Sequence, residues 1–316
     1  MAFSGENFEM AKGKPYSGLF PVAPTPFLET GEIDLQSQRR VLDCMIDQQV
    51  DGICILANYS EQFLLSDDER TQLVDLCLDH VAGRVPVMVT CSHFSTEIAG
   101  ARARYAAECG AELIMLMPPY HGAGINVDEP TMKEHFEFVA DSAKVPIMIQ
   151  DAPLSGVSLS VEFLVHLART VPLVRYFKIE VPGAAGKLRA LIEAGGEAIE
   201  GPFDGEEAIT MMADLDAGAT GVMASALLPD LIRPVIEHHR SGRREEAMKM
   251  YERILPLINY ENRQCGLRAA KTVMAEGNVI RSDHVRHPLK PLHPATRRGL
   301  LELARSVNPL ALTWGL

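Results

Sequence analysis

A lysine and a glutamate stand two residues apart in an apolar segment of this sequence, "VRYFKIEVPG" at residues 174–183. Its β-branched and aromatic residues predict a strand, which Pro182 and Gly183 end. Residues i and i+2 of a strand face the same side, so the side chains of Lys178 and Glu180 should lie together. Lysine is uncommon inside strands and is rarely buried without a partner, so this placement needs an explanation.

Schiff-base chemistry is one explanation for the pair. Burial disfavours the charged ammonium, which lowers the pKa of a lysine and frees the neutral amine to attack a carbonyl carbon. The protonated imine then acidifies the neighbouring carbon, and the carboxylate of Glu180 can move protons there. The alternative is a buried ion pair between Lys178 and Glu180 that only fixes packing. By themselves, the two residues leave both possibilities open.

Eight short apolar runs typical of buried strands follow one another along the chain: "GLFPVAP", "GICILA", "VPVMVTCS", "ELIMLMPP", "VPIMIQDAP", "VRYFKIE", "EAIEGPF" and "TGVMAS". Amphipathic stretches of helical period separate them. Strands buried on both faces and joined by crossover helices indicate a parallel sheet. Eight such units favour an α/β fold of the (β/α)8 TIM-barrel type over the alternative, a doubly wound sheet.

The expected organisation has three parts. Residues 1–14 form a disordered leader, residues 15–240 form the barrel, and residues 241–316 form a C-terminal helical region packed on the barrel. The carboxyl ends of barrel strands carry the active site in this fold, so the polar side chains at the strand ends are the candidates for chemistry. This context favours the catalytic interpretation of Lys178.

Composition narrows the classes of partner. The chain has 316 residues, of which 47% are apolar, and a formal net charge of −12, which argues against a nucleic-acid partner. No run approaches the length of a membrane span. The six cysteines show no metal-binding spacing, and neither a P-loop nor a G-x-G-x-x-G motif is present. These features predict a cytoplasmic protein that binds a small molecule and needs no metal or organic cofactor.

Five segments occur in an order typical of a known family: "LFPVAPTPF", "GICILANYSEQFLLSDDER", "LMPPYHG", "IMIQDAP" and "FKIE". From about Tyr16 to about Asn308, the chain resembles the dihydrodipicolinate synthase and N-acetylneuraminate lyase superfamily of class I aldolases and dehydratases. The resemblance implies that Lys178 is the Schiff-base lysine and that the substrate is a 2-keto acid. It also implies a homotetramer built as a dimer of dimers.

The resemblance places further binding residues. Asn58, Tyr59 and Ser60 occupy the segment that reads Gly-Thr-Thr-Gly-Glu in relatives and holds the carboxylate and imine side of the substrate. Tyr120 and His121 take the place of a tyrosine pair, of which the second crosses a subunit interface in relatives. We therefore expect Tyr120 in the catalytic group and His121 among the substrate-binding residues.

Gln150 is the most informative departure from the family pattern. Relatives that make or break carbon–carbon bonds have a tyrosine there, which relays protons, whereas an amide does not titrate near neutral pH. With Glu180 as the available proton carrier, the sequence predicts elimination of water from a 2-keto-3-deoxy sugar acid. The alternatives are an aldolase that releases pyruvate from such an acid and a barrel that only binds a ligand.

Other acidic residues near strand ends receive mainly structural interpretations. Glu61 is expected to be a structural residue at the end of a strand. Asp204 is expected to cap the following helix, with a lesser possibility of contacting substrate hydroxyls, and Glu206 and Glu207 are expected to favour the first turn of that helix through its dipole.

Overall fold

The computed structural model of the protein describes residues 15–122 and 125–316, so the predicted leader lies outside the described residues. Eight strands follow the predicted order: β1 (Gly18–Leu19), β2 (Ile53–Ile55), β3 (Val87–Thr90), β4 (Leu113–Leu116), β5 (Ile147–Asp151), β6 (Val174–Ile179), β7 (Gly201–Asp204) and β8 (Gly221–Val222). All seven strand pairs are parallel, and the sheet order is β1-β8-β7-β6-β5-β4-β3-β2. Apart from the pair of β1 and β8, neighbours are consecutive in the chain, unlike the reversed order of a doubly wound sheet.

The segment after β1 touches strands on both sides. Val22 forms parallel bridges with Cys54 in β2 and with Ser225, which follows β8. The amide of Ala23 donates to the carbonyl of Cys54 at 2.8 Å, and the amide of Val22 donates to that of Ala224 at 2.8 Å. The eight parallel strands therefore form a curled sheet whose edge strands are linked through this segment.

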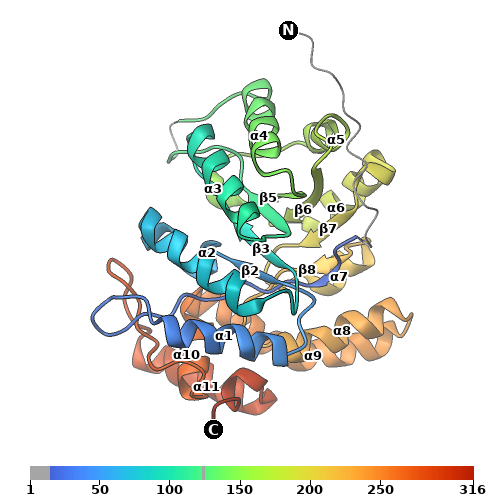
Figure 1. Cartoon of the computed structure of the whole chain (residues 1–316). Helices are drawn as coiled ribbons and strands as arrows, with labels where there is room; N and C mark the ends of the chain where they lie inside the picture. Colours follow the sequence, from blue (N-terminus) through green and yellow to red (C-terminus); the bar gives the residue numbers. More distant parts are fainter. Residues whose placement is uncertain (1–14, 123–124) are drawn as a thin grey trace.

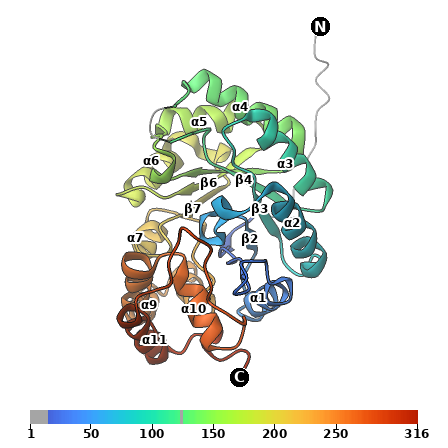
Figure 2. The same ribbon diagram turned by 90° about the vertical axis from the view of Figure 1, so that its left-hand side faces the viewer.

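A helix follows each strand and lies outside the curled sheet (Figure 2). These helices are α1 (Leu35–Asp47), α2 (Asp67–Val81), α3 (Thr96–Glu108), α4 (Glu129–Ala143), α5 (Val161–Thr170), α6 (Ala184–Gly195), α7 (Met211–Asp216) and α8 (Pro229–Arg240). Several of these helices begin after an N-cap residue whose side chain accepts a hydrogen bond from a backbone amide of the first turn. This bond stabilises the start of the helix. The N-caps of this type are Asp34, Ser66, Ser95, Asp128 and Ser160.

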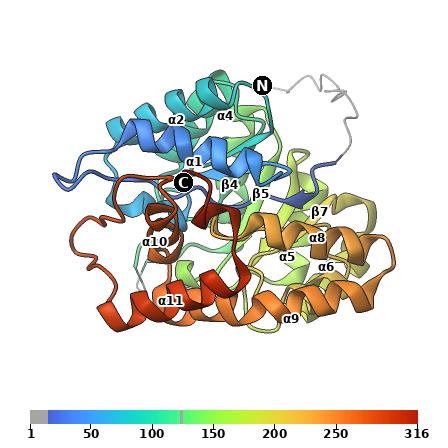
Figure 3. The same cartoon turned by 90° about the horizontal axis from the view of Figure 1, so that it is seen from below.

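Three more helices follow in the described chain: α9 (Arg244–Tyr260), α10 (Arg268–Glu276) and α11 (Pro294–Val307). A π-helical turn, Glu261–Cys265, separates α9 from α10. Helix α9 packs against α8 and α11, and these helices lie together in the lower part of Figures 1 and 3. The division into domains at residue 240 stays a prediction.

The core has two layers, inside and outside the curled sheet. The inner cluster contains Phe20, Met88, Met115, Met148, Tyr176, Phe203 and Met223 together with smaller neighbours. The outer cluster lies between strands and helices and includes Phe177 and Ile179 of β6. Because side chains alternate along a strand, Lys178 shares the inner face with Tyr176. This confirms the predicted inward direction of the lysine.

Candidate active site

Strand β6 carries Lys178 into the interior, between β5 and β7. The side chain of Lys178 is 3% exposed, and its Nζ lies 3.1 Å from Oε2 of Glu180 and 3.6 Å from Oε1 of Glu207. In the register of the sheet, Gln150 of β5 stands beside Lys178 on one side and Phe203 of β7 on the other. The structure therefore brings Lys178 and Glu180 together, and adds a second carboxylate.

The predicted fall in the pKa of Lys178 is wrong. Burial does lower the pKa of this ammonium, but the charges of Glu180 and Glu207 raise it by more, and the net pKa lies above the ordinary value. Two nearby carboxylates outweigh desolvation because each favours the charged form. The unliganded lysine is therefore an ammonium, which must lose a proton before its nitrogen can attack a carbonyl.

Gln150 holds the first of these carboxylates. Its Nε2 donates a 2.8 Å hydrogen bond to Oε2 of Glu180, the same oxygen that faces Lys178. Gln150 is 1% exposed, and its Oε1 has no hydrogen-bond partner among the described residues. The three predicted residues Lys178, Glu180 and Gln150 thus form one hydrogen-bonded group, in which the amide orients the carboxylate.

Glu207 is a site residue that the sequence analysis misplaced. Helix α7 begins at Met211, so Glu206 and Glu207 do not lie in its first turn, and that prediction is wrong. Glu207 is 6% exposed, and its pKa is raised well above the ordinary value by burial, and by Glu180, Glu261 and Asp204, although Lys178 opposes this. A glutamate at a strand end was the only sign of it in the sequence.

Gly205 lets the loop that follows β7 approach β6. A Cβ at this position would lie 2.8 Å from both the carbonyl oxygen of Ile179 and Cγ of Lys178, closer than real contacts allow. The amide of Gly205 donates to that carbonyl of Ile179 at 3.0 Å. The sequence Asp-Gly-Glu-Glu therefore fixes the loop against the lysine, which places Glu207 beside its nitrogen.

Asp204 is the last residue of β7 and does not cap a helix, which corrects the predicted role. Its Oδ1 accepts a 2.9 Å hydrogen bond from the amide of Glu206, inside the loop. Asp204 is fully buried, and burial together with Asp214 raises its pKa well above the ordinary value. A contact between Asp204 and substrate hydroxyls stays a prediction.

The segment after β2 supplies the three predicted binding residues. Tyr59 donates from its hydroxyl to Oδ1 of Asn262 at 3.1 Å, and burial followed by the charges of Glu207, Glu261 and Glu180 raises its pKa. Tyr59 therefore faces the carboxylate group around Lys178.

The two neighbours of Tyr59 have different settings. Ser60 is 1% exposed and donates to the carbonyl of Ala23 at 2.7 Å, so its hydroxyl already ties the segment down. Asn58 is half-buried and accepts from Nε2 of Gln62 at 3.4 Å. We keep both as predicted binding residues.

The loop after β4 holds Tyr120 and His121. Tyr120 is half-buried, and burial raises its pKa. His121 is exposed, bridges to Ile125 and lies with its ring centroid 6.0 Å from that of Phe94. Among the described residues, no hydrogen bond joins either side chain to Lys178 or Glu180, so the roles of both stay predictions.

Two buried ionisable groups near the site were not identified from the sequence. Lys271 of α10 donates to Oε1 of Glu61 at 2.7 Å, and both side chains are 0% exposed. This agrees with the structural interpretation of Glu61. Glu261, in the π-helical turn, is 2% exposed, and burial raises its pKa to about 7. A lysine and a glutamate on amphipathic helices give no local sign of burial, so no pattern distinguished them.

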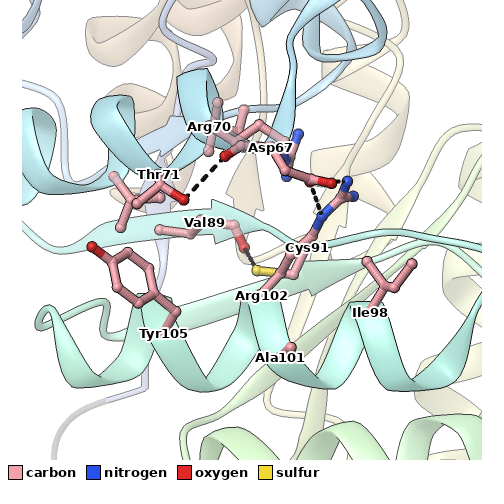
Figure 4. Close-up of a pocket in the computed structure, with 11 residues that line it drawn as sticks. Asp67, Arg70, Thr71, Val89, Cys91, Ile98, Ala101, Arg102 and Tyr105 are labelled. Carbon is pink, nitrogen blue, oxygen red and sulfur yellow. Dashed lines mark hydrogen bonds and ion pairs between the residues drawn. The ribbon is translucent and has the colours of Figure 1, made fainter.

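A pocket of about 290 Å³ lies apart from this group, between α2, α3 and β3 (Figure 4). The ion pair between Asp67 and Arg102 lies at this pocket, with Cys91 nearby. None of the predicted site residues lines it, so it is separate from the lysine group. Within the described residues, no group of three or more His, Cys, Asp or Glu side chains could hold a metal ion. No described helix has the length and hydropathy needed to cross a membrane.

The model of the dihydrodipicolinate synthetase family matches residues 15–306, and the chain belongs to this family. The chain is 56% identical over 299 residues to L-2-keto-3-deoxyarabonate dehydratase of Azospirillum brasilense, covering 95% of this chain and 97% of that protein. The resemblance inferred from the motifs is thereby confirmed.

More distant relatives share the same architecture. The chain is 29% identical over 293 residues to 4-hydroxy-tetrahydrodipicolinate synthase of Rhizobium meliloti, covering 89% of this chain and 95% of that one. Among solved structures, a putative dihydrodipicolinate synthetase from Pseudomonas aeruginosa superposes with a TM-score of 0.86 at 28% identity, covering 92% of this chain and 99% of that one. The shared fold therefore covers 92% of this chain.

Proposed function

We propose that the protein is a Schiff-base dehydratase that converts L-2-keto-3-deoxyarabonate into 2-oxoglutarate semialdehyde and water. The observation that carries this proposal is the group formed by Lys178, Glu180 and Gln150, in which an amide replaces a proton-relaying tyrosine. The 56% identity to a protein named for this reaction supports the choice of substrate. Pentose catabolism without phosphorylated intermediates is the expected setting.

In the proposed reaction, the amine of Lys178 condenses with the C2 carbonyl of the substrate and releases water. Glu180 then takes a C3 proton, and the resulting enamine expels the C4 hydroxyl, which leaves as water after receiving a proton. Loss of a C5 proton gives a dienol, which gains one proton at C3 and one at C4 and loses its hydroxyl proton to become an aldehyde. Hydrolysis of the imine releases the product.

Elimination rather than cleavage follows from what Gln150 can do. Cleavage of the C3–C4 bond requires removal of the C4 hydroxyl proton, and the amide of Gln150 cannot accept it. The carboxylate of Glu180 is held at 2.8 Å by that amide, in a position to act on the carbon next to the imine. Tyr120 is a further catalytic residue of the proposed site. The proposed substrate contacts are Asn58, Tyr59, Ser60, His121 and Asp204.

Assembly and location are further parts of the proposal. We propose that the curled sheet is a closed (β/α)8 barrel, supported by the bridges from Val22 to both sides, with α9–α11 as its C-terminal extension. The homotetramer, the absence of a metal or organic cofactor, and the cytoplasmic location stay predictions.

The direct test is product identification. Purified protein is incubated with L-2-keto-3-deoxyarabonate, without added metal or nucleotide, and the products are followed by proton NMR. We expect 2-oxoglutarate semialdehyde as the product. Pyruvate with glycolaldehyde would instead establish an aldolase and overturn the interpretation of Gln150, and unchanged substrate would overturn the proposed function.

A further inference from the structure

Two carboxylates flank the nitrogen of Lys178, and they differ in what else they contact. Oε2 of Glu180, which faces Lys178, also accepts a hydrogen bond from Gln150. The side chain of Glu180 is 27% exposed. Glu207 approaches the same nitrogen with Oε1 at 3.6 Å, is 6% exposed, and its Oε2 has no hydrogen-bond partner among the described residues. One carboxylate is thus open to the substrate side, whereas the other contacts mainly the lysine.

The backbone around Glu207 is held in an unfavourable conformation. Glu207 and Ala208 have φ angles of +55° and +67°, in a region that residues with a side chain rarely adopt and that costs free energy. Tyr251 of α9 fixes the loop by donating from its hydroxyl to the carbonyl of Ala208 at 3.1 Å. Gly205 holds the other side against β6. Strain of this kind persists where the surrounding structure enforces a side-chain position, often at a functional site.

Imine formation needs a group that can hold a proton for a short time. The lysine is an ammonium before substrate binds, so one proton must leave its nitrogen before attack. After attack, the oxygen of the carbinolamine must gain protons to depart as water. The net reaction, ammonium plus carbonyl giving protonated imine plus water, is balanced in atoms and charge, so the carrier ends in its starting state.

We propose that Glu207 is this proton carrier, a catalytic residue for imine formation at Lys178, while Glu180 acts on the carbon atoms of the substrate. Glu207 takes a proton from the ammonium, the freed amine attacks C2, and the protonated Glu207 gives that proton to the carbinolamine oxygen. Glu207 then moves a second proton from the nitrogen to the hydroxyl, which departs as water and leaves the protonated imine. This inference rests on the proposed Schiff-base function. It assigns a role to a residue that the local sequence did not distinguish.

The surroundings of Glu207 suit a group that alternates between two protonation states. Burial favours the neutral form of Glu207, as do the charges of Glu180, Glu261 and Asp204. The charge of Lys178 favours the ionised form of Glu207. The net pKa lies above the ordinary value, which makes the carboxylate a stronger base than an exposed glutamate and favours transfer of a proton to it from the ammonium of Lys178. Tyr59 and Cys54 are further titratable neighbours, and the charge of Glu207 raises the pKa of each, after burial.

The test separates imine formation from elimination. Wild-type and variant proteins are mixed with L-2-keto-3-deoxyarabonate, quenched with borohydride after increasing times, and analysed by mass spectrometry for the reduced adduct on Lys178; released product is measured in parallel. Glu207→Gln should form the adduct about 100-fold more slowly or worse, the usual scale for losing an acid–base group. Glu180→Gln should form the adduct near the wild-type rate but lose product release by a similar factor.

Glu206→Gln is the matched control. It removes a carboxylate from the same loop, and its side chain accepts from Thr210 rather than contacting the lysine. We expect wild-type rates of adduct formation and product release from this variant. Thermal unfolding by circular dichroism checks that all variants fold. If Glu207→Gln does not fold, Glu207→Asp, which keeps a carboxylate, takes its place. The aspartate variant should form adduct more slowly than wild type.

The outcomes distinguish this inference from the proposed function. The charge of Glu207 raises the pKa of Lys178, so replacing Glu207 lowers that pKa. This change alone would make attack by the amine faster. Slower adduct formation in the variant would therefore show that the proton carrier is missing. An adduct that forms at the wild-type rate in Glu207→Gln overturns the role of Glu207 while leaving the dehydratase intact. If the wild-type protein forms neither adduct nor product, the proposed function fails and this inference fails with it.

Discussion

Two lysines are buried in the described part of the chain, and they differ in the carboxylates around them and in the exposure of those carboxylates. Lys178 lies at the inner face of β6 between two carboxylates, of which Glu180 is partly exposed. Lys271 lies on α10 against a single carboxylate, Glu61, and both of these side chains are fully buried. Phe27 covers Lys271, with its ring centroid 4.5 Å from Nζ. Only the first lysine therefore forms an ion pair with a partly exposed side chain.

The two lysines also differ in the direction of their pKa values. Burial lowers the pKa of both ammonium groups. At Lys178 the charges of Glu180 and Glu207 outweigh burial, whereas at Lys271 burial outweighs Glu61 and Asp283 and the charge of Arg286 adds to the lowering. A buried lysine with a low pKa is therefore not by itself the mark of a Schiff-base site. What separates Lys178 is the partly exposed carboxylate of Glu180 beside it and a second carboxylate, Glu207, 3.6 Å from its nitrogen.

The largest expected effect comes from Lys178→Met, which removes the nucleophile and keeps the side-chain length. Turnover of L-2-keto-3-deoxyarabonate should fall by roughly 10⁴-fold or more, because no other group forms the covalent intermediate. Product formation measured by NMR, with the borohydride adduct as a second readout, checks this. Lys271→Met is the matched variant at the other lysine and should still form the adduct on Lys178. Adduct formation that depended on Lys271 instead would reverse the comparison.

Lys271→Met should reduce stability rather than chemistry. It leaves the carboxylate of Glu61 buried and unpaired, which costs about 3–5 kcal/mol in the free energy of unfolding. Urea denaturation measures the loss. The double variant Lys271→Met/Glu61→Gln should regain most of it, because no unpaired charge remains. Equal stability of the single variant and the wild type would show that the buried pair contributes nothing.

Glu261 is a third case of a buried ionisable side chain, and its Oε1 has no hydrogen-bond partner among the described residues. Burial raises its pKa from the ordinary 4.5 to about 7. Between these pH values the folded protein holds one proton more than the unfolded chain, so stability falls as pH rises through this window. At pH 8, Glu261→Gln should be more stable than wild type by about 3 kcal/mol.

The pH dependence of that gain is the decisive measurement. The stability difference between Glu261→Gln and wild type should shrink toward zero as the pH falls below about 4.5, where the glutamate becomes neutral in the unfolded chain as well as in the folded protein. Urea unfolding of both proteins across this pH range gives the curve. A difference that does not change with pH would mean that Glu261 does not titrate in the folded state as described.

The smallest expected effect concerns the contact between the binding segment and the C-terminal region. Tyr59→Phe removes the 3.1 Å hydrogen bond to Asn262 and should lower the free energy of unfolding by about 1 kcal/mol. If Tyr59 also binds substrate, KM should rise while the rate of adduct formation at saturation stays within a few-fold of wild type. Asn262→Ala, which removes the same bond from the other side, separates the two contributions.

Much of the fold could be predicted from local patterns. Eight apolar runs separated by amphipathic stretches indicated eight parallel strands with crossover helices, and the two-residue period of a strand placed Lys178 inward with Glu180 beside it. Gln150 was found from the family motif and lies next to Lys178 in the register of the sheet. These features depend on periodicity or on a motif, both of which are visible in the sequence.

The sequence by itself determined the order of elements and the face on which Lys178 lies, because both follow from residue spacing along the chain. Only the tertiary structure decided that Glu207 reaches the lysine, since this depends on a positive φ and on the close approach of Gly205 to β6. It also decided the pKa direction of Lys178 and the pairing of Lys271 with Glu61, 210 residues away. Electrostatics and long-range contacts depend on distances in space, and local periodicity does not carry that information.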